Sequence, residues 1–274
     1  MTNAERQFES ELEIFRTESE AATQFFYGYL AVHEVAKHHK RVFRLLNQYA
    51  LFWNTVLGAL QTSALIALHR IFNNRSRHNV DSLLRIAETN PFIFSKHALG
   101  PRKQGDNQIQ PGWLNEYLEN AYEPTTEDFR RIRGHVEKYK QIYEAKYAGL
   151  RNKVYAHKVA SDSAEIQTLV AKTDIREMER LFVFLLKLHE TLWQLFVNGR
   201  KPVLRPLRYS AKRMRTSPSP TSRGNSVQER ITSEAEQLLL RACATQHGVA
   251  VDVLRAAPRP PAHHRTSRTR ARRR

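Results

Sequence analysis

An uncharged, largely apolar stretch runs from Leu45 to Leu68 and limits what this chain can fold into. As a helix it is long enough to span a bilayer. It also contains polar side chains that would be costly to expose to lipid, namely Asn47, Gln48, Asn54, Thr55, Gln61, Thr62 and Ser63. We therefore expect a helix buried at the centre of a bundle, and no membrane partner.

Apolar residues return at three- and four-residue spacing through much of the first 200 positions, which is the pattern of amphipathic helices. No alternating strand pattern of useful length is present. The predicted helices cover about 5–39, about 42–72, a short segment capped by Asp81, a segment starting at Thr125 or Thr126 and reaching the 151–157 region, and a segment from about Asp174 to Phe196. The expected fold class is all-α, a bundle of four or five main helices.

Composition sets the expected domain organisation. Residues 1–200 are predicted to form the bundle, with an insertion at about 91–124 in which 100–107 is polar and rich in turn residues. Residues 201–274 are rich in Arg, Pro and Ser and cannot bury a core. We expect them to form a mostly disordered tail with one helical island at 233–245.

The net charge of +17 is concentrated in that tail. Residues 201–274 hold 17 Lys and Arg against 4 Asp and Glu, which leaves the first 200 residues with only +4. The bundle is therefore nearly neutral, and high pI alone does not make it a nucleic-acid binder. The tail either binds an acidic surface through counterion release or has no dedicated role.

Cysteine and histidine usage argues against a metalloprotein. The single cysteine, Cys243, excludes an intrachain disulfide and a Cys-based zinc site. The paired histidines at 38–39 and 263–264 have no partner ligands at a useful spacing, so neither a metal nor a cofactor is expected. The N-terminus lacks the basic-then-apolar order of a secretory signal, which favours a cytoplasmic location.

The segment from Arg151 to His157 contains the residue types needed to cut RNA. His157, with an ordinary imidazole pKa near ~6.5, can take a proton from a ribose 2′-OH or give one to the leaving 5′-oxygen. Arg151 can bind the phosphate through its planar guanidinium and stabilise charge in the transition state. Asn152 can orient the imidazole or the phosphate. The predicted product is a 2′,3′-cyclic phosphate, formed without a metal.

Three neighbouring side chains could bind the RNA around that pair. Lys153 and Lys158 can contact adjacent phosphates, and Tyr155 offers a ring for an unpaired base or for packing in the bundle. On a straight helix, Arg151 and His157 lie about 120° apart around the axis. A kink near Gly149, or pairing of two copies across a dimer axis, would be needed to bring them together.

The segment 150–158, LRNKVYAHK, resembles the signature of the HEPN superfamily, in which an Arg and a polar residue precede a His by several positions. Upstream, 67–73 (ALHRIFN) followed by 82–85 (SLLR) resembles AbiU-like abortive-infection HEPN proteins. The resemblance covers about 20–198. It implies a dimeric helical bundle whose catalytic pair, Arg151 and His157, faces a shared cleft.

The same resemblance implies a ribonuclease toxin of phage defence or of a toxin–antitoxin system, with RNA and an antitoxin protein as partners. Toxins paired with nucleotidyltransferase antitoxins often carry a Tyr two places after the His, where this chain has Val159. Two other hypotheses stay open from the residues alone. One is a non-catalytic RNA- or nucleotide-binding module that uses Arg151 and Lys153, and the other is a helical scaffold that acts through its tail.

Overall fold

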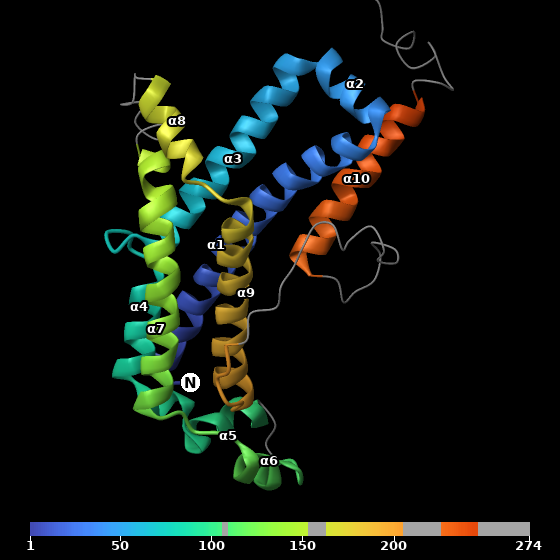
Figure 1. Ribbon diagram of the computed structural model, residues 1–274. Coiled ribbons are helices and arrows are strands. Elements are labelled where there is room, and N and C mark those ends of the chain that lie inside the picture. Colours follow the sequence, from blue (N-terminus) through green and yellow to red (C-terminus); the bar gives the residue numbers. More distant parts are fainter. Residues whose placement is uncertain (106–108, 153–162, 205–225, 246–274) are drawn as a thin grey trace, which may run out of the picture.

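The computed structural model describes residues 1–105, 109–152, 163–204 and 226–245. Within these ranges every regular element is helical, which confirms the all-α prediction. The long helices α1 (Asn3–His38), α7 (Thr126–Tyr143) and α9 (Ile175–Asn198) pack together with α4 (Val80–Thr89) to form the body of the bundle (Figure 1).

Helix α1 closely follows its prediction because its sequence carries both a start signal and an apolar stripe. Thr2 and Glu5 form a reciprocal capping box, in which each side chain accepts a hydrogen bond from the other residue's backbone N–H. The buried stripe then passes through Phe8, Leu12 and Phe15, which are at most 5% exposed. Burying such a side chain contributes roughly 1.5–3 kcal/mol.

The prediction of one continuous helix over 42–72 was wrong. The structure has two helices there, α2 (Lys40–Gln48) and α3 (Ala50–Phe72), which meet at Tyr49 with φ −115° and ψ 43°. Neither Pro nor Gly marks the break, so the sequence pattern gave no sign of it. The second half of α3 is buried as expected, through Leu65, Leu68 and Ile71.

The first half of α3 contradicts the expectation of a helix surrounded by others. Leu51 is 85% exposed and Phe52 is 61% exposed. In the most apolar 18-residue segment of α3, only 22% is buried. Among the helices in the described ranges, α3 is the one that is long and apolar enough to cross a membrane, judged by length and composition alone. An exposed apolar face of this kind is typical of a surface that contacts another molecule.

Residues 100–104 at the base of the bundle are helical, whereas the polar, turn-rich sequence of 100–107 predicted a loop. After η1 (Pro91–Phe94), residues Lys96–Gln104 form α5, which includes Pro101 inside the helix, and Leu114–Asn120 form α6. Arg102 on α5 forms a buried ion pair with Glu5 and donates to the Phe196 carbonyl at 3.1 Å. These contacts hold α5 firmly against α1 and α9.

A further helix, α10 (Val227–Thr245), packs on α1 and α2. The predicted island at 233–245 is therefore part of a longer helix. Its buried face supplies Leu239 and Cys243 to a second apolar cluster with Val32, Val35 and Val42. The second half of α1, α2, the first half of α3 and α10 together extend from one end of the body (Figure 1), and we call this part the arm.

Candidate functional site

The Arg151 segment follows α7 through a widened stretch of helix. Thr125 and Asp128 cap the start of α7 reciprocally, as the sequence predicted. After Tyr143 the winding changes to a π-helix, η2 (Glu144–Ala148), and residues 151–152 are again π-wound. Such wide turns are uncommon and occur often at functional sites.

The wide turns change which way Arg151 points. In a regular α-helix, eight residues cover roughly 800°, which would place Arg151 about 80° away from Tyr143 around the axis. A π turn holds more residues, so each residue contributes less rotation. The π-wound residues therefore turn Arg151 back toward the side of the helix that carries Tyr143.

The π-helix is anchored to the start of α9 by two side chains. Tyr147 is fully buried, and its hydroxyl donates to the Asp174 carbonyl at 2.8 Å. Burial is the main reason that the pKa of Tyr147 is raised to about 12, so this hydroxyl keeps its proton. Lys146 forms an ion pair with Glu177. Both contacts hold the π-helix against the start of α9.

Gly149 lets another helix approach this segment closely. A Cβ placed on Gly149 would lie 3.2 Å from Cδ2 of Leu169, on α8 (Ser163–Ala171). A larger residue at this position would require the Leu169 side chain to shift by a few tenths of an ångström. The glycine therefore allows close packing of α8 two residues before Arg151.

Arg151 is half-buried and held by its neighbour. Its Nη1 donates to Oδ1 of Asn152 at 2.8 Å. Its Nε is buried and has no hydrogen-bond partner among the described residues. A guanidinium that is partly desolvated, fixed on one side and unsatisfied on another is well suited to bind a phosphate oxygen.

A hydrogen-bonded histidine lies on α3 beside this arginine. Asn73 Oδ1 accepts from the Arg75 backbone N–H at 3.1 Å, which directs its amide nitrogen to His69 Nε2 at 2.9 Å. Because Nε2 then accepts, Nδ1 carries the proton and donates to the Tyr143 hydroxyl at 3.1 Å. The network assigns His69 a neutral imidazole.

Burial and the charge of Arg151 act together on this histidine. Burial lowers the pKa of His69, and the Arg151 guanidinium lowers it further. Burial also raises the pKa of the Tyr143 hydroxyl well above its ordinary value of 10, while Arg151 opposes that rise. Tyr143 is 2% exposed, so it holds His69 in place and does not contact solvent.

The side of α7 that faces α4 is fixed by a polar network. Lys140 Nζ donates to Asp81 Oδ2 and to Asn74 Oδ1, both at 2.8 Å. Arg133 pairs with Glu88, with Nη2 and Oε2 2.7 Å apart. Asp81 was predicted to cap α4, but the N-cap is Asn79, whose Oδ1 accepts from the Ser82 N–H. Asp81 instead binds α7.

Comparison with known proteins decides the family. The family model HEPN_AbiU2, described as AbiU2, matches residues 6–214. The chain belongs to the AbiU2 family of HEPN proteins. The resemblance stated from the 150–158 and 67–73 segments is thereby confirmed. Searches of curated proteins and of solved structures give no match. The protein is an abortive-infection-related protein of the HEPN type.

Only some of the predicted site residues of this AbiU2-family chain lie within the described ranges. Arg151 and Asn152 are described and contact each other, so Asn152 orients the arginine, a role that the sequence did not suggest. His157, Lys153, Tyr155 and Lys158 lie outside the described residues. The pairing of Arg151 with His157 therefore stays a prediction.

The structure adds Tyr143, which contacts His69 and which the sequence analysis did not single out. Tyr143 lies eight residues before Arg151 and looked like an ordinary core position. His69 stood in the 67–73 segment that resembled the family, but its contact with Tyr143 was not foreseen. A buried Tyr near an imidazole on another helix leaves no local pattern in sequence. Across the described residues, no group of three or more His, Cys, Asp and Glu side chains could hold a metal ion.

Proposed function

We propose that this protein is a metal-independent endoribonuclease that acts as a toxin in phage defence or in a toxin–antitoxin system, with an antitoxin protein as a partner. The observation that carries the proposal is the Arg151 guanidinium, which is half-buried, held by Asn152 and without a hydrogen-bond partner at Nε among the described residues, in a chain of the AbiU2 family. An arginine in this state can bind a scissile phosphate and stabilise the charge that develops there.

In the proposed reaction the 2′-oxygen of a ribose attacks the adjacent phosphorus. The P–O2′ bond forms, the P–O5′ bond breaks, and a 2′,3′-cyclic phosphate and a free 5′-OH result. His157 takes the 2′-OH proton or gives the proton that the 5′-oxygen needs. Lys153 and Lys158 bind flanking phosphates, and Tyr155 stacks on an unpaired base. His69 and Tyr143 position the residues around Arg151.

We further propose that two copies assemble the site. On one regular helix, Arg151 and His157 would lie about 120° apart around the axis. The π winding at 151–152 lowers the rotation per residue and would not bring the two side chains to the same side. The exposed apolar half of α3 offers a surface for a second copy, and the same helix carries His69 toward Arg151. The polar side chains Asn54 and Gln61 on α3 favour a protein partner there over lipid.

Cleavage of RNA by the full-length protein in excess chelator tests the enzyme proposal. We expect cyclic-phosphate ends in the product, and a loss of rate of at least about 10²-fold in Arg151→Ala and in His157→Ala. Arg130→Ala is the control, because Arg130 lies on α7 but its side chain is 73% exposed. RNA binding without cleavage would favour the non-catalytic module and would contradict the enzyme.

Sedimentation tests the assembly proposal. The wild-type chain should be a dimer, and the double variant Leu51→Glu/Phe52→Glu should be a folded monomer with reduced cleavage. Ile109→Glu is the matched control, because Ile109 is 84% exposed but lies away from α3. A wild-type chain that stays monomeric at every concentration tested would refute the dimer.

A further inference from the structure

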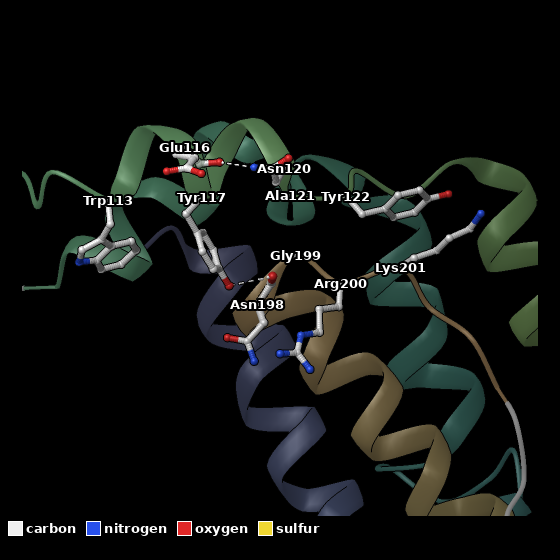
Figure 2. Close-up of a pocket in the computed structure, with 10 residues that line it drawn as sticks. All are labelled: Trp113, Glu116, Tyr117, Asn120, Ala121, Tyr122, Asn198, Gly199, Arg200 and Lys201. Carbon is white, nitrogen blue, oxygen red and sulfur yellow. Dashed lines mark hydrogen bonds between the residues drawn. The ribbon is translucent and has the colours of Figure 1, made fainter.

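A hollow lies at the base of the bundle, at the opposite end of α7 and α9 from Arg151. It has a volume of about 690 Å³ and is bordered by α6, the end of α9 and the residues that follow each of them. Figure 2 shows the rings of Trp113 and Tyr117 on one flank and Tyr122 with Lys201 on the other. Ligand pockets of proteins commonly have this size.

The aromatic flank is preformed. Tyr117 is fixed by its hydroxyl, which donates to the Asn198 carbonyl at 2.9 Å. Trp113 lies edge-on to it, with ring centroids 5.7 Å apart and an interplanar angle of 81°. Trp113 nevertheless remains 52% exposed, so a large ring is held in place with much of its surface open to solvent. Such a ring can stack a planar ligand without reorganisation.

The cationic flank is set by the end of α9. Gly199 has φ +55° and ends the helix, and the next two residues are Arg200 and Lys201. Both are exposed, and neither forms an ion pair with a carboxylate among the described residues. Lys201 Nζ lies 5.4 Å from the centroid of the Tyr122 ring. Among the described residues that line the hollow, Glu116 is the one acidic side chain, so the two cations outweigh it.

We propose that this hollow binds a nucleotide, with the base stacked on Trp113 and the phosphate held by Arg200 and Lys201. An exposed indole on one flank, and on the other flank cations without a carboxylate partner among the described residues, provide the flat surface and the positive charge that such a ligand requires. The ligand is either a free nucleotide or the phosphorylated end of a single strand. Both share this chemistry.

The binding site is separate from the proposed cleavage site. Helix α7 alone contains 18 residues, which corresponds to roughly 27 Å between its ends. The hollow lies near the beginning of α7, and Arg151 follows its end. Binding at the hollow is therefore expected to survive the loss of Arg151, whether or not the protein cleaves RNA.

Titration of the full-length protein tests the proposal. Calorimetry with adenosine, AMP and ATP probes the free nucleotide, and anisotropy with a short 5′-phosphorylated 2′-O-methyl oligonucleotide probes a strand that cannot be cut by 2′-OH attack. Trp113→Leu keeps apolar bulk but removes the ring, and should weaken binding about tenfold or more. Arg200→Ala should weaken phosphate-bearing probes but not adenosine.

Two control variants accompany these titrations. Trp193→Leu removes another partly exposed indole, outside the hollow, and should bind as wild type. Arg130→Ala, at a 73% exposed position of α7 outside the hollow, should also bind as wild type. Binding of AMP or ATP would identify a free nucleotide, and binding of the oligonucleotide alone would identify a strand. Binding of no probe, or binding that both Trp113→Leu and Arg200→Ala leave intact, would overturn the proposal.

Discussion

Arg102 joins three separate parts of the chain. Its guanidinium pairs with Glu5 on α1, donates to the Ile93 carbonyl at 2.7 Å, and lies 4.2 Å from the centroid of the Phe196 ring. The side chains of Arg102 and Glu5 are only 9% and 5% exposed. Because both charges are largely removed from water, each depends on the other for stabilisation.

Removing Arg102 alone should therefore be costly. We expect Arg102→Met to lower the free energy of unfolding by about 3–5 kcal/mol, because it leaves the Glu5 carboxylate buried without its partner. The double variant Glu5→Gln/Arg102→Met should recover part of that loss. Urea unfolding measures both. The control is Arg130→Met, because Arg130 and its partner Glu127 are 73% and 54% exposed, and about 1 kcal/mol or less is expected.

His69 should make the protein sensitive to mild acid. Its pKa is lowered by burial and by Arg151, so the unfolded chain binds a proton more readily than the folded one. Stability should therefore fall as pH drops through the ordinary histidine value of 6.5. His69→Gln should flatten this fall in Tm between pH 7 and pH 5.

Two other histidines limit the size of that effect. Burial also lowers the pKa of His33 and His189, so His69→Gln should flatten the pH dependence without abolishing it. A variant whose Tm falls with acid as steeply as that of the wild type would show that His69 is not held neutral.

Single residues of the site could be predicted only where chemistry and spacing coincide. Arg151 and Asn152 were predicted as site residues because their types and positions match a reaction, and their catalytic role stays a prediction. Tyr143 was not found, because its role depends on a histidine 74 positions earlier and on π turns between it and Arg151. Neither a long-range contact nor a widened turn has a local sequence signature.

The end of α9 is a tightly packed junction between elements. A Cβ on Gly199 would lie 2.8 Å from Leu99 Cδ2 and 2.9 Å from Ala121 Cβ, and the positive φ disfavours any other residue. We expect Gly199→Ala to lower the free energy of unfolding by about 2 kcal/mol or more, measured by urea unfolding.

Gly134 offers the matched comparison. It lies inside α7, and a Cβ there would have no neighbour within 4 Å. Gly134→Ala should raise stability by about 0.5–1 kcal/mol, because alanine has the higher helix propensity and restricts the unfolded chain. Equal effects of the two substitutions would mean that the conformation at Gly199 is unimportant.

Helices were predictable where caps and apolar periodicity agreed, as in α1, α7 and α9. The prediction for α9 even named Asp174, which is its N-cap. It failed for α5, because Gly100 and Pro101 indicated a turn, whereas Arg102 binds η1 and α9 through tertiary contacts that hold the helix. It also failed at Tyr49, where the helix breaks without a Pro or Gly. Local propensity does not contain such contacts.

The arm depends on α10, a segment from the basic C-terminal region. Two adjacent leucines on α10 differ sharply, since Leu239 is 2% exposed and Leu238 is 66% exposed. We expect Leu239→Ala to cost about 2 kcal/mol or more and Leu238→Ala to stay within about 0.5 kcal/mol. Hydrogen exchange should locate the loss in α2 and the second half of α1. Equal exchange in both variants would show that α10 does not stabilise the arm.

The all-α class of the whole molecule followed from the sequence, since amphipathic periodicity without strand patterns has few solutions. The family also followed, from two short segments. The arm could not be predicted in this way. Which side of α10 is buried depends on the side of α1 against which it packs, and that contact is not visible in the sequence. The division of the chain into a bundle of 1–200 and a tail of 201–274 stays a prediction, with α10 packed on the bundle.

The π-helix after Tyr143 has a consequence for comparing this protein with its relatives. A wide turn accommodates residues without adding a full turn of rotation, so the count of residues between two positions no longer tells which side of the helix they share. A relative that lacked one residue within Glu144–Ala148 could present its arginine in the same direction from a regular helix. Alignments of this segment should therefore be judged by which side of the helix each residue occupies, and not by the number of residues between two positions.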